Sequence, residues 1–184
     1  MFRAFASLIQ SALDIVLPRK ERVVRIENYS LEDIPVSPVE HEVCGVQITT
    51  LMSYRAEIVD DLIRALKYDR FGHAATLLAG VLAEYLREEI ANIRSFSVKP
   101  VVLIPVPLHA ARHRERGFNQ VESILSELPR EFKDGTLSRV VVGALTRTRD
   151  TAHQTRLSRS ERLRNVEDAF ELSAADAESV RGAH

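Results

Sequence analysis

A short apolar run, Val101-Val102-Leu103-Ile104, restricts the fold of this 184-residue chain more than any other feature. Pro100 and Pro105 close it on both sides, so the run is too short for a helix and predicts a strand that is buried on both faces. A second apolar run, Val140-Val141-Val142, predicts another buried strand. Strands of this kind are typical of a parallel sheet that is covered by helices.

Helical patterns separate these strands. The residues from Val46 to Tyr54 have the β-branched density of a further strand. Two stretches then show apolar residues at helical spacing, at Ile58, Val59, Leu62, Ile63 and Leu66, and at Leu77, Leu78, Val81, Leu82, Tyr85 and Leu86. Asn119, followed three residues later by Glu122, is a candidate cap for a helix that Pro129 ends. The alternation of strands and helices predicts an α/β fold.

The first part of the chain has a different character. Residues 2–17 are mostly apolar but are interrupted by polar side chains, so they predict an amphipathic helix that ends at Pro18 rather than a signal peptide or a membrane span. The polar stretch from Arg19 to Cys44 predicts an irregular connector with one short strand at Arg22–Ile26. We therefore expect no membrane insertion and a cytoplasmic location.

The net charge of −1 is the average of two opposed regions. The stretch from Glu27 to Asp61 contains eight acidic residues and one basic residue. The stretch from Leu145 to Arg164 contains six arginines and two acidic residues. The whole-chain charge gives no reason to expect nucleic acid or an anionic membrane as a partner. Cys44 is the single cysteine, which excludes an internal disulfide and a multi-cysteine zinc site.

An arginine-rich segment follows the first buried strand. Arg112, Arg114 and Arg116 alternate there, and Gly117 allows a ligand to approach the backbone closely before the next helix. Ligands of open α/β sheets bind beyond the carboxyl ends of the strands, and arginine grips phosphate oxygens in pairs. The segment therefore predicts a loop that binds phosphate or pyrophosphate, and a solvated basic loop is the alternative.

Two histidines of this segment, His109 and His113, are spaced as a metal-binding pair would be on a helix. No third ligand candidate lies nearby, and the segment has no clear helical pattern. Zinc needs three or four protein ligands, so we predict no metal site here.

A second arginine-rich segment runs from Leu145 to Phe170. Its first half is polar and predicts a lid that closes over a bound polyanion, with ligand contacts from Arg147, Arg149 and Gln154. Its second half begins a short helix at Ser158, where Glu161 completes the S-x-x-E pattern. A returning strand is predicted at Ala169–Leu172. Single-stranded nucleic acid is the competing ligand for both basic segments, but base stacking needs more aromatic residues than the single Phe118.

At these motifs the chain resembles the ComF family, competence-associated proteins of the phosphoribosyltransferase superfamily. The resemblance rests on IPVPLH at 104–109, RERGFNQ at 114–120, LTRTRDT at 145–151, QTRLSRSERLRNVEDAF at 154–170 and, more weakly, ALKYDRFG at 65–72. It implies a type I phosphoribosyltransferase fold, a parallel sheet flanked by helices. It also implies that the loop after the first core strand contacts the pyrophosphate of phosphoribosyl diphosphate, which is bound with Mg²⁺. The ligand-facing residues would be His109, Arg112, Arg116, Gly117 and Lys67.

The chain departs from this family pattern twice. ComF proteins usually carry a four-cysteine zinc ribbon, and the corresponding stretch here keeps only Cys44, so we expect no structural zinc. Residues 1–45 are then an N-terminal helix and connector that remain from the ribbon, and residues 46–184 are a partial phosphoribosyltransferase-like domain. The family signature of an apolar strand, two acidic residues and a Thr-Thr-Gly loop is expected after Val180-Arg181-Gly182 and does not occur in the chain. We expect a domain that is incomplete at its C-terminus and inactive alone, with no assignable catalytic residue.

Two functions follow from these observations. The first is a phosphoribosyltransferase-like protein that binds phosphoribosyl diphosphate through its arginine-rich loop, with an acceptor that the sequence does not identify. The second is a non-catalytic accessory module for DNA uptake that binds single-stranded DNA or a competence helicase. In either case a sheet that ends at Leu172 should expose an apolar edge, so we expect low stability or assembly into a homo-oligomer.

Overall fold

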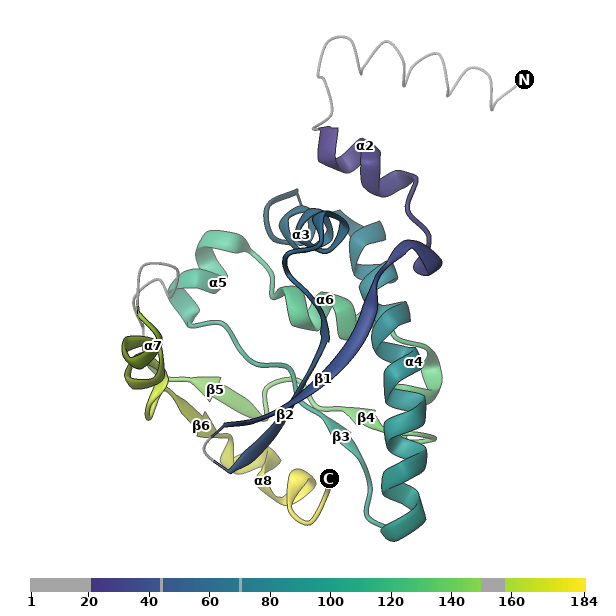
Figure 1. Ribbon diagram of the computed structural model, residues 1–184. Helices are drawn as coiled ribbons and strands as arrows, with labels where there is room; N and C mark the ends of the chain where they lie inside the picture. The colour runs from purple at the N-terminus through teal and green to yellow at the C-terminus, as the bar shows by residue number, and fades with distance from the viewer. Residues whose placement is uncertain (1–20, 44, 70, 150–157) are drawn as a thin grey trace, which may run out of the picture. The chain divides into compact units, whose positions relative to one another are not determined.

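The computed structural model describes residues 21–43, 45–69, 71–149 and 158–184 (Figure 1). The chain divides into two compact units, Met1–Leu77 and Leu78–His184, with the boundary inside helix α4 (Gly72–Phe96). The helix predicted before Pro18 lies outside the described residues. The domain boundary predicted near residue 45 stays a prediction.

The first unit combines short helices with a β-hairpin. Its elements before α4 are α2 (Glu21–Glu27), the 3-10 helix η1 (Leu31–Asp33), β1 (Val36–Val43), β2 (Val46–Met52), α3 (Glu57–Arg64) and the π-helical segment η2 (Ala65–Asp69). The strands β1 and β2 pair antiparallel, from Val36 opposite Met52 to Val43 opposite Val46. Strand β2 and helix α3 confirm the elements predicted at these positions.

Two predictions for the connector are wrong. Residues 22–26 were expected as a strand and belong to helix α2 instead. The stretch expected to be irregular contains the eight-residue strand β1, although it includes Pro38. The pairing of β1 is irregular between Val36 and Val39, so the strand accommodates the proline where the ladder is already interrupted.

An ion pair explains why residues 21–27 are helical. The Nε and Nη2 atoms of Arg25 in α2 donate to the two carboxylate oxygens of Asp61 in α3, each at 2.8 Å. Asp61 is only 5% exposed, and the hydroxyl of Tyr29 lies 3.4 Å from the same carboxylate. The hydrogen bond with Asp61 raises the pKa of Arg25 above its ordinary value. The helix is therefore fixed by a bidentate contact that spans 36 residues of sequence and that no local pattern predicts.

The second unit contains the remaining elements. After α4 these are β3 (Val102–Leu103), α5 (Ala110–Arg116), α6 (Gln120–Glu127), η3 (Arg130–Phe132), β4 (Arg139–Val140), β5 (Leu145–Arg147), α7 (Arg159–Val166), β6 (Phe170–Leu172) and α8 (Ala174–Val180). The helices α4, α6 and α7 and the strand β6 confirm elements predicted from the sequence.

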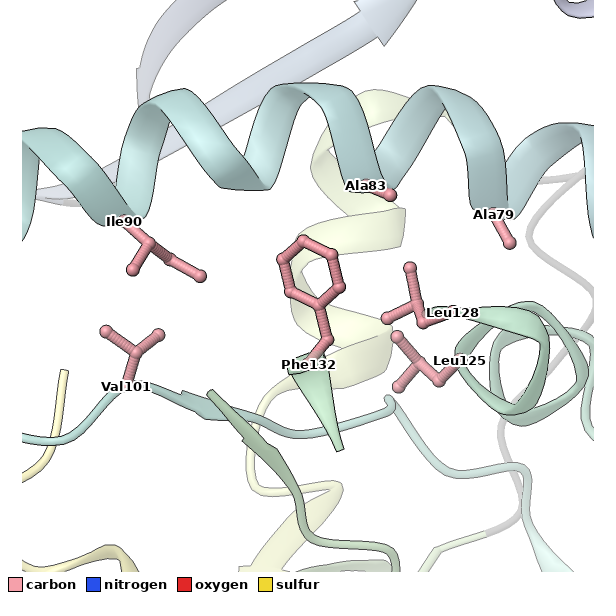
Figure 2. Packing of buried hydrophobic residues seen from close by; sticks show 7 residues of the cluster. All are labelled: Ala79, Ala83, Ile90, Val101, Leu125, Leu128 and Phe132. Atoms are coloured by element: carbon pink, nitrogen blue, oxygen red, sulfur yellow. The ribbon is translucent and has the colours of Figure 1, made fainter. Parts of the chain in front are cut away.

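The core of this unit forms around Phe132, which is fully buried. Figure 2 shows its ring pointing towards α4, with side chains around it from α4, from the residue before β3 and from the end of α6. The buried members of this cluster are Ala79, Ala83, Ile90, Val101, Leu125, Leu128 and Phe132. The α4 residues at the centre of this core, Ala79, Ala83 and Ile90, are not those of the apolar face predicted for this helix, of which Leu82 and Leu86 pack against the cluster and are partly buried.

The strands β3 and β4 are parallel, with Val102 opposite Arg139 and Leu103 opposite Val140. On the other edge of β3, the His184 N–H donates to the Pro100 carbonyl at 2.9 Å and the Val102 N–H donates to the His184 carbonyl at 3.0 Å. This is the hydrogen-bond pattern of a parallel pair. On this edge the parallel pattern is limited to the single residue His184, which belongs to no strand.

The mixture of helices and strands is confirmed, but the predicted parallel sheet is not seen among the described residues, which contain only two-stranded sheets, two of them antiparallel. The strands β3 and β4 have two residues each, and β5 pairs with β6 antiparallel. The second apolar run is less buried than predicted, because β4 ends at Val140 and Val142 is 58% exposed. The turn at Gly143, with φ of 90°, takes the chain away from the strand direction at this point.

Candidate functional site

The arginine-rich segment after β3 folds as helix α5, where the sequence predicted a loop. His109 caps it, because its Nδ1 accepts a hydrogen bond from the Ala111 N–H at 3.4 Å. Gly117 ends it in the left-handed conformation, with φ of 76°, and its N–H donates to the His113 carbonyl at 2.7 Å. Glycine adopts this conformation without a steric penalty, so Gly117 is here a helix-terminating residue.

The helical conformation changes which arginines lie together. Residues four apart share one face of a helix, which groups Arg112 with Arg116 and directs Arg114 to the opposite side. The burial agrees, since Arg112 and Arg116 are half-buried and Arg114 is exposed. His109 precedes Arg112 by three residues and begins the same face. Three of the predicted ligand contacts are thus brought together, and the alternating set of three arginines is not.

Asn119 connects this helix to the next one. Its side chain is buried, and the residue is 3% exposed. The Oδ1 atom accepts from the Val121 N–H at 3.0 Å, which confirms the predicted cap of α6. The Nδ2 atom donates to the Val106 carbonyl and to Glu122 Oε1, both at 3.0 Å. Glu122 therefore accepts from the side chain of Asn119 rather than from its backbone, and the bond to Val106 is one that sequence reasoning missed.

Gln120, the first residue of α6, carries an orphaned donor. Its Nε2 atom is buried and has no hydrogen-bond partner among the residues that the structure describes. Buried amides without a partner are uncommon and cost free energy. The sequence offered no signal for it beyond the position of Gln120 in the motif RERGFNQ.

The second arginine-rich segment is built differently. Arg147 of β5 lies over the ring of Phe170 in β6, with its Cζ 5.5 Å from the ring centroid. Arg149 donates through Nη2 to the backbone carbonyls of Asn165 and Glu167, at the C-terminal end of α7. A cation at this end of a helix is stabilised by the helix dipole. Both arginines contact the protein itself, and their predicted contact with a ligand stays a prediction, while Gln154 lies outside the described residues.

Helix α7 begins as the S-x-x-E pattern predicted. The Glu161 N–H donates to Ser158 Oγ at 3.4 Å, and the Ser158 N–H donates to Glu161 Oε2 at 2.7 Å. Hydrogen bonds from the Ser158 side chain and backbone lower the pKa of Glu161. The arginine-rich stretch therefore contains a helix that is fixed at both ends.

Lys67 belongs to the first unit and lies in η2. Its Nζ is 5.0 Å from the ring centroid of Tyr68, a cation–π contact between neighbours in sequence. The next helix, α4, begins at Gly72. The role of Lys67 towards a ligand stays a prediction.

The described residues have neither a metal-binding cluster nor a membrane-spanning helix. No three His, Cys, Asp or Glu side chains within the described ranges lie close enough together to hold a metal ion. Among the helices of those ranges, none combines the length and the apolar character that crossing a bilayer requires.

The chain is similar to bacterial proteins named DNA utilization protein YhgH. It is 34% identical over 139 residues to the proteins of Escherichia coli strain K12 and Shigella flexneri, which is 75% of this chain and 56% of theirs. It is 34% identical over 124 residues to the protein of Salmonella typhimurium, 67% of this chain and 50% of that one. The chain thus spans about half the length of these relatives. No protein-family model and no solved structure matches it.

Proposed function

We propose that this chain acts in DNA utilization as a phosphoribosyltransferase-like protein of the ComF type, and that helix α5 binds the pyrophosphate group of phosphoribosyl diphosphate. The observation that carries the proposal is the common face of His109, Arg112 and Arg116, directly after the parallel strand β3. The names of the relatives support the biological setting, since they are called DNA utilization proteins. The resemblance of the motifs to ComF proteins supports the ligand.

The chemistry of this face suits a polyphosphate. Two guanidinium groups one helical turn apart can each grip two oxygens, and an imidazole at the start of the face adds a further donor. Gly117, at the end of α5, lets phosphate oxygens approach the backbone without a side chain in the way. The position of α5 after the carboxyl end of β3 is where ligands of parallel sheets bind. We therefore infer that α5 recognises the leaving group of the ligand.

Magnesium would accompany this ligand rather than occupy a protein cage. Mg²⁺ keeps several waters and binds mainly through substrate phosphates, which fits a site without a cluster of three acidic ligands within the described ranges. When bound, the ion would neutralise charge on the pyrophosphate. The residues of α5 would bind and orient the same group from the protein side.

Two backbone features support a parallel sheet of the phosphoribosyltransferase type. β3 pairs in parallel with β4, and His184 pairs with the opposite edge of β3 in the parallel pattern. The helices α5 and α6 lie between the two strands in sequence, as the crossover of a βαβ unit requires. We infer that β3 is an inner strand of such a sheet.

Calorimetric titration of the 184-residue chain with phosphoribosyl diphosphate and Mg²⁺ tests the proposal. Arg112→Ala and Arg116→Ala should each weaken binding about tenfold or more, because each removes charge-assisted hydrogen bonds. Arg114→Ala is the matched control, since it removes the same charge from the exposed side of the same helix. Binding that is absent in the native chain, or that Arg114→Ala weakens as much as Arg116→Ala, would contradict this site.

Single-stranded DNA is the second candidate ligand, and the names of the relatives favour it. Arg114 and Arg164, both exposed, would then contribute as readily as the half-buried Arg116. Phosphate contacts of this kind weaken steeply as salt rises. Fluorescence anisotropy with a labelled oligonucleotide at low and moderate salt measures this. Equal losses for Arg114→Ala and Arg116→Ala would support DNA binding, and the absence of binding at low salt would exclude it.

A further inference from the structure

The side chain of Asn119 makes more hydrogen bonds than a helix cap needs. Capping of α6 requires only Oδ1, which accepts from the Val121 N–H, and Ser, Thr or Asp cap helices about as well. The two Nδ2 hydrogens are used as well, one on the Val106 carbonyl and one on Glu122 Oε1. The amide orientation is fixed by these partners, because the Val121 N–H only donates and the Val106 carbonyl only accepts. The Nδ2 contacts therefore need an explanation other than capping.

The bond to Val106 reaches into a segment that has no regular structure of its own. Residues 104–109 lie between β3 and α5 and belong to no helix or strand. The carbonyl of Val106 is 13 residues away from Asn119 in sequence, and the bond ties this segment to the first turn of α6. Because Asn119 is 3% exposed, water competes little for the contact. The segment is thus held at its middle by a buried side chain.

The position of α5 depends on this contact. A helix of seven residues is marginal alone, so its placement is set by what holds its ends. The C-terminal end is fixed by Gly117, two residues before Asn119, and the N-terminal end is fixed by His109, three residues after Val106. Asn119 therefore touches the connections at both ends of the helix that carries Arg112 and Arg116.

We propose that Asn119 is a positioning residue, which holds residues 104–109 so that α5 presents His109, Arg112 and Arg116 to a polyphosphate ligand. The proposal rests on the proposed function for the identity of that ligand. Asn119 acts through α5 and has no contact with the ligand. A loop that is ordered in advance loses less conformational entropy on binding, so the bond contributes to affinity.

Asn119→Ser separates capping from positioning. The serine hydroxyl still caps α6, but it is too short to reach Val106 and has only one hydrogen to donate. We expect this variant to remain folded and to bind Mg²⁺–phosphoribosyl diphosphate about three- to tenfold more weakly than the native chain. Ser123→Ala is the matched control, because it removes a bond of Ser123 Oγ to the Asn119 carbonyl and no bond to the loop. Asn119→Asp, which retains the cap and lacks the N–H donors, replaces Asn119→Ser if the latter does not fold.

A double-mutant comparison tests whether Asn119 acts through α5. In an Arg112→Ala background, Asn119→Ser should reduce the affinity by a smaller factor than in the native chain, because one of the contacts that Asn119 positions is already lost. An equal loss in both backgrounds would show a general destabilisation and overturn the proposal.

Amide hydrogen exchange gives a readout that needs no ligand. Asn119→Ser should speed exchange across residues 106–116, and Ser123→Ala should not. Unchanged exchange in Asn119→Ser, or equal acceleration in both variants, would overturn the proposed clamp. A native chain that does not bind the ligand would instead overturn the proposed function, and the exchange comparison would still decide the role of Asn119.

Discussion

The helices α5 and α7 are two short helices in arginine-rich segments of the same unit, and they use arginine in opposite ways. In α5 the arginines belong to the helix, and Arg112 and Arg116 share one of its faces. In α7 the relevant arginine comes from outside, because Arg149, two residues after β5, donates to the carbonyls at the end of the helix. The number of arginines in a segment therefore does not decide its function. The position of Arg149 beyond the C-terminal end of α7 lets it hold that helix, whereas contact of Arg112 and Arg116 with a ligand is our proposal.

The largest expected difference between the two helices is in ligand affinity. Arg116→Ala should weaken binding of Mg²⁺–phosphoribosyl diphosphate about tenfold or more, because it removes a guanidinium from the α5 face. Arg149→Ala should change the affinity less than about twofold if its role is to hold α7. Parallel calorimetric titrations of the two variants measure this. A loss at Arg149 as large as that at Arg116 would break the comparison and support the lid predicted from the sequence.

The next effect concerns how the helices end. Gly117→Ala should destabilise the protein by about 1–2 kcal/mol, because alanine resists the left-handed backbone that terminates α5. Gly117→Asn should cost less, since asparagine tolerates this conformation better. Urea unfolding of the two variants gives the free energies. Equal losses for alanine and asparagine would show that backbone strain is not the cause.

The corresponding change at α7 should have a smaller effect. Arg149→Ala should cost about 1 kcal/mol or less in the free energy of unfolding, because it removes exposed hydrogen bonds to two carbonyls. The same variant should raise amide exchange in the last turn of α7 and leave α5 unchanged. Thermal unfolding and hydrogen exchange measure the two quantities. If exchange in α5 rises as well, the two helices are not held independently.

The smallest expected effect is that low pH destabilises the first turn of α7. Hydrogen bonds with Ser158 lower the pKa of Glu161 in the folded state. The ionised carboxylate therefore contributes fully to the free energy of unfolding above the ordinary glutamate pKa of about 4.5, and this contribution is lost as pH falls through the lowered folded value. The first turn of α7 should therefore fray in acid, which exchange or NMR at several pH values can follow. Glu161→Gln should remove this dependence, and a variant that retains it would place its origin elsewhere.

The sequence predicted those features whose cause is local. Ser158 and Glu161 form their capping box within four residues. Asn119 caps α6 by accepting a hydrogen bond from the backbone N–H of Val121, two residues further along the chain. The apolar runs predicted strands, and Leu103 of the first run does pair in parallel with Val140 of the second. Patterns of this kind are visible because the interacting groups recur at fixed spacing along the chain.

The features that were missed depend on distant partners. The helical state of residues 21–27 follows from the bond of Arg25 with Asp61, and the bond of Asn119 with Val106 crosses 13 residues. In α5 the alternation of arginines suggested an extended loop, and the caps at His109 and Gly117 made it a helix instead. No spacing rule relates residues that are so far apart in sequence. The sequence could therefore predict which residues belong to the candidate face, but not how they are arranged in space.

The Arg25–Asp61 ion pair of the first unit and the apolar cluster around Phe132 in the second unit can form at different times while the chain is being synthesised. The contact between Arg25 and Asp61 lies wholly within the N-terminal part, so it can form as soon as α3 has emerged from the ribosome. The cluster around Phe132 forms later, because Phe132 is made well after Ile90 and the other α4 residues that surround it. Domains generally fold from the N-terminus during translation, and exposed apolar surface favours aggregation in the meantime. We therefore expect nascent chains that end between α4 and Phe132 to be the species most in need of a chaperone.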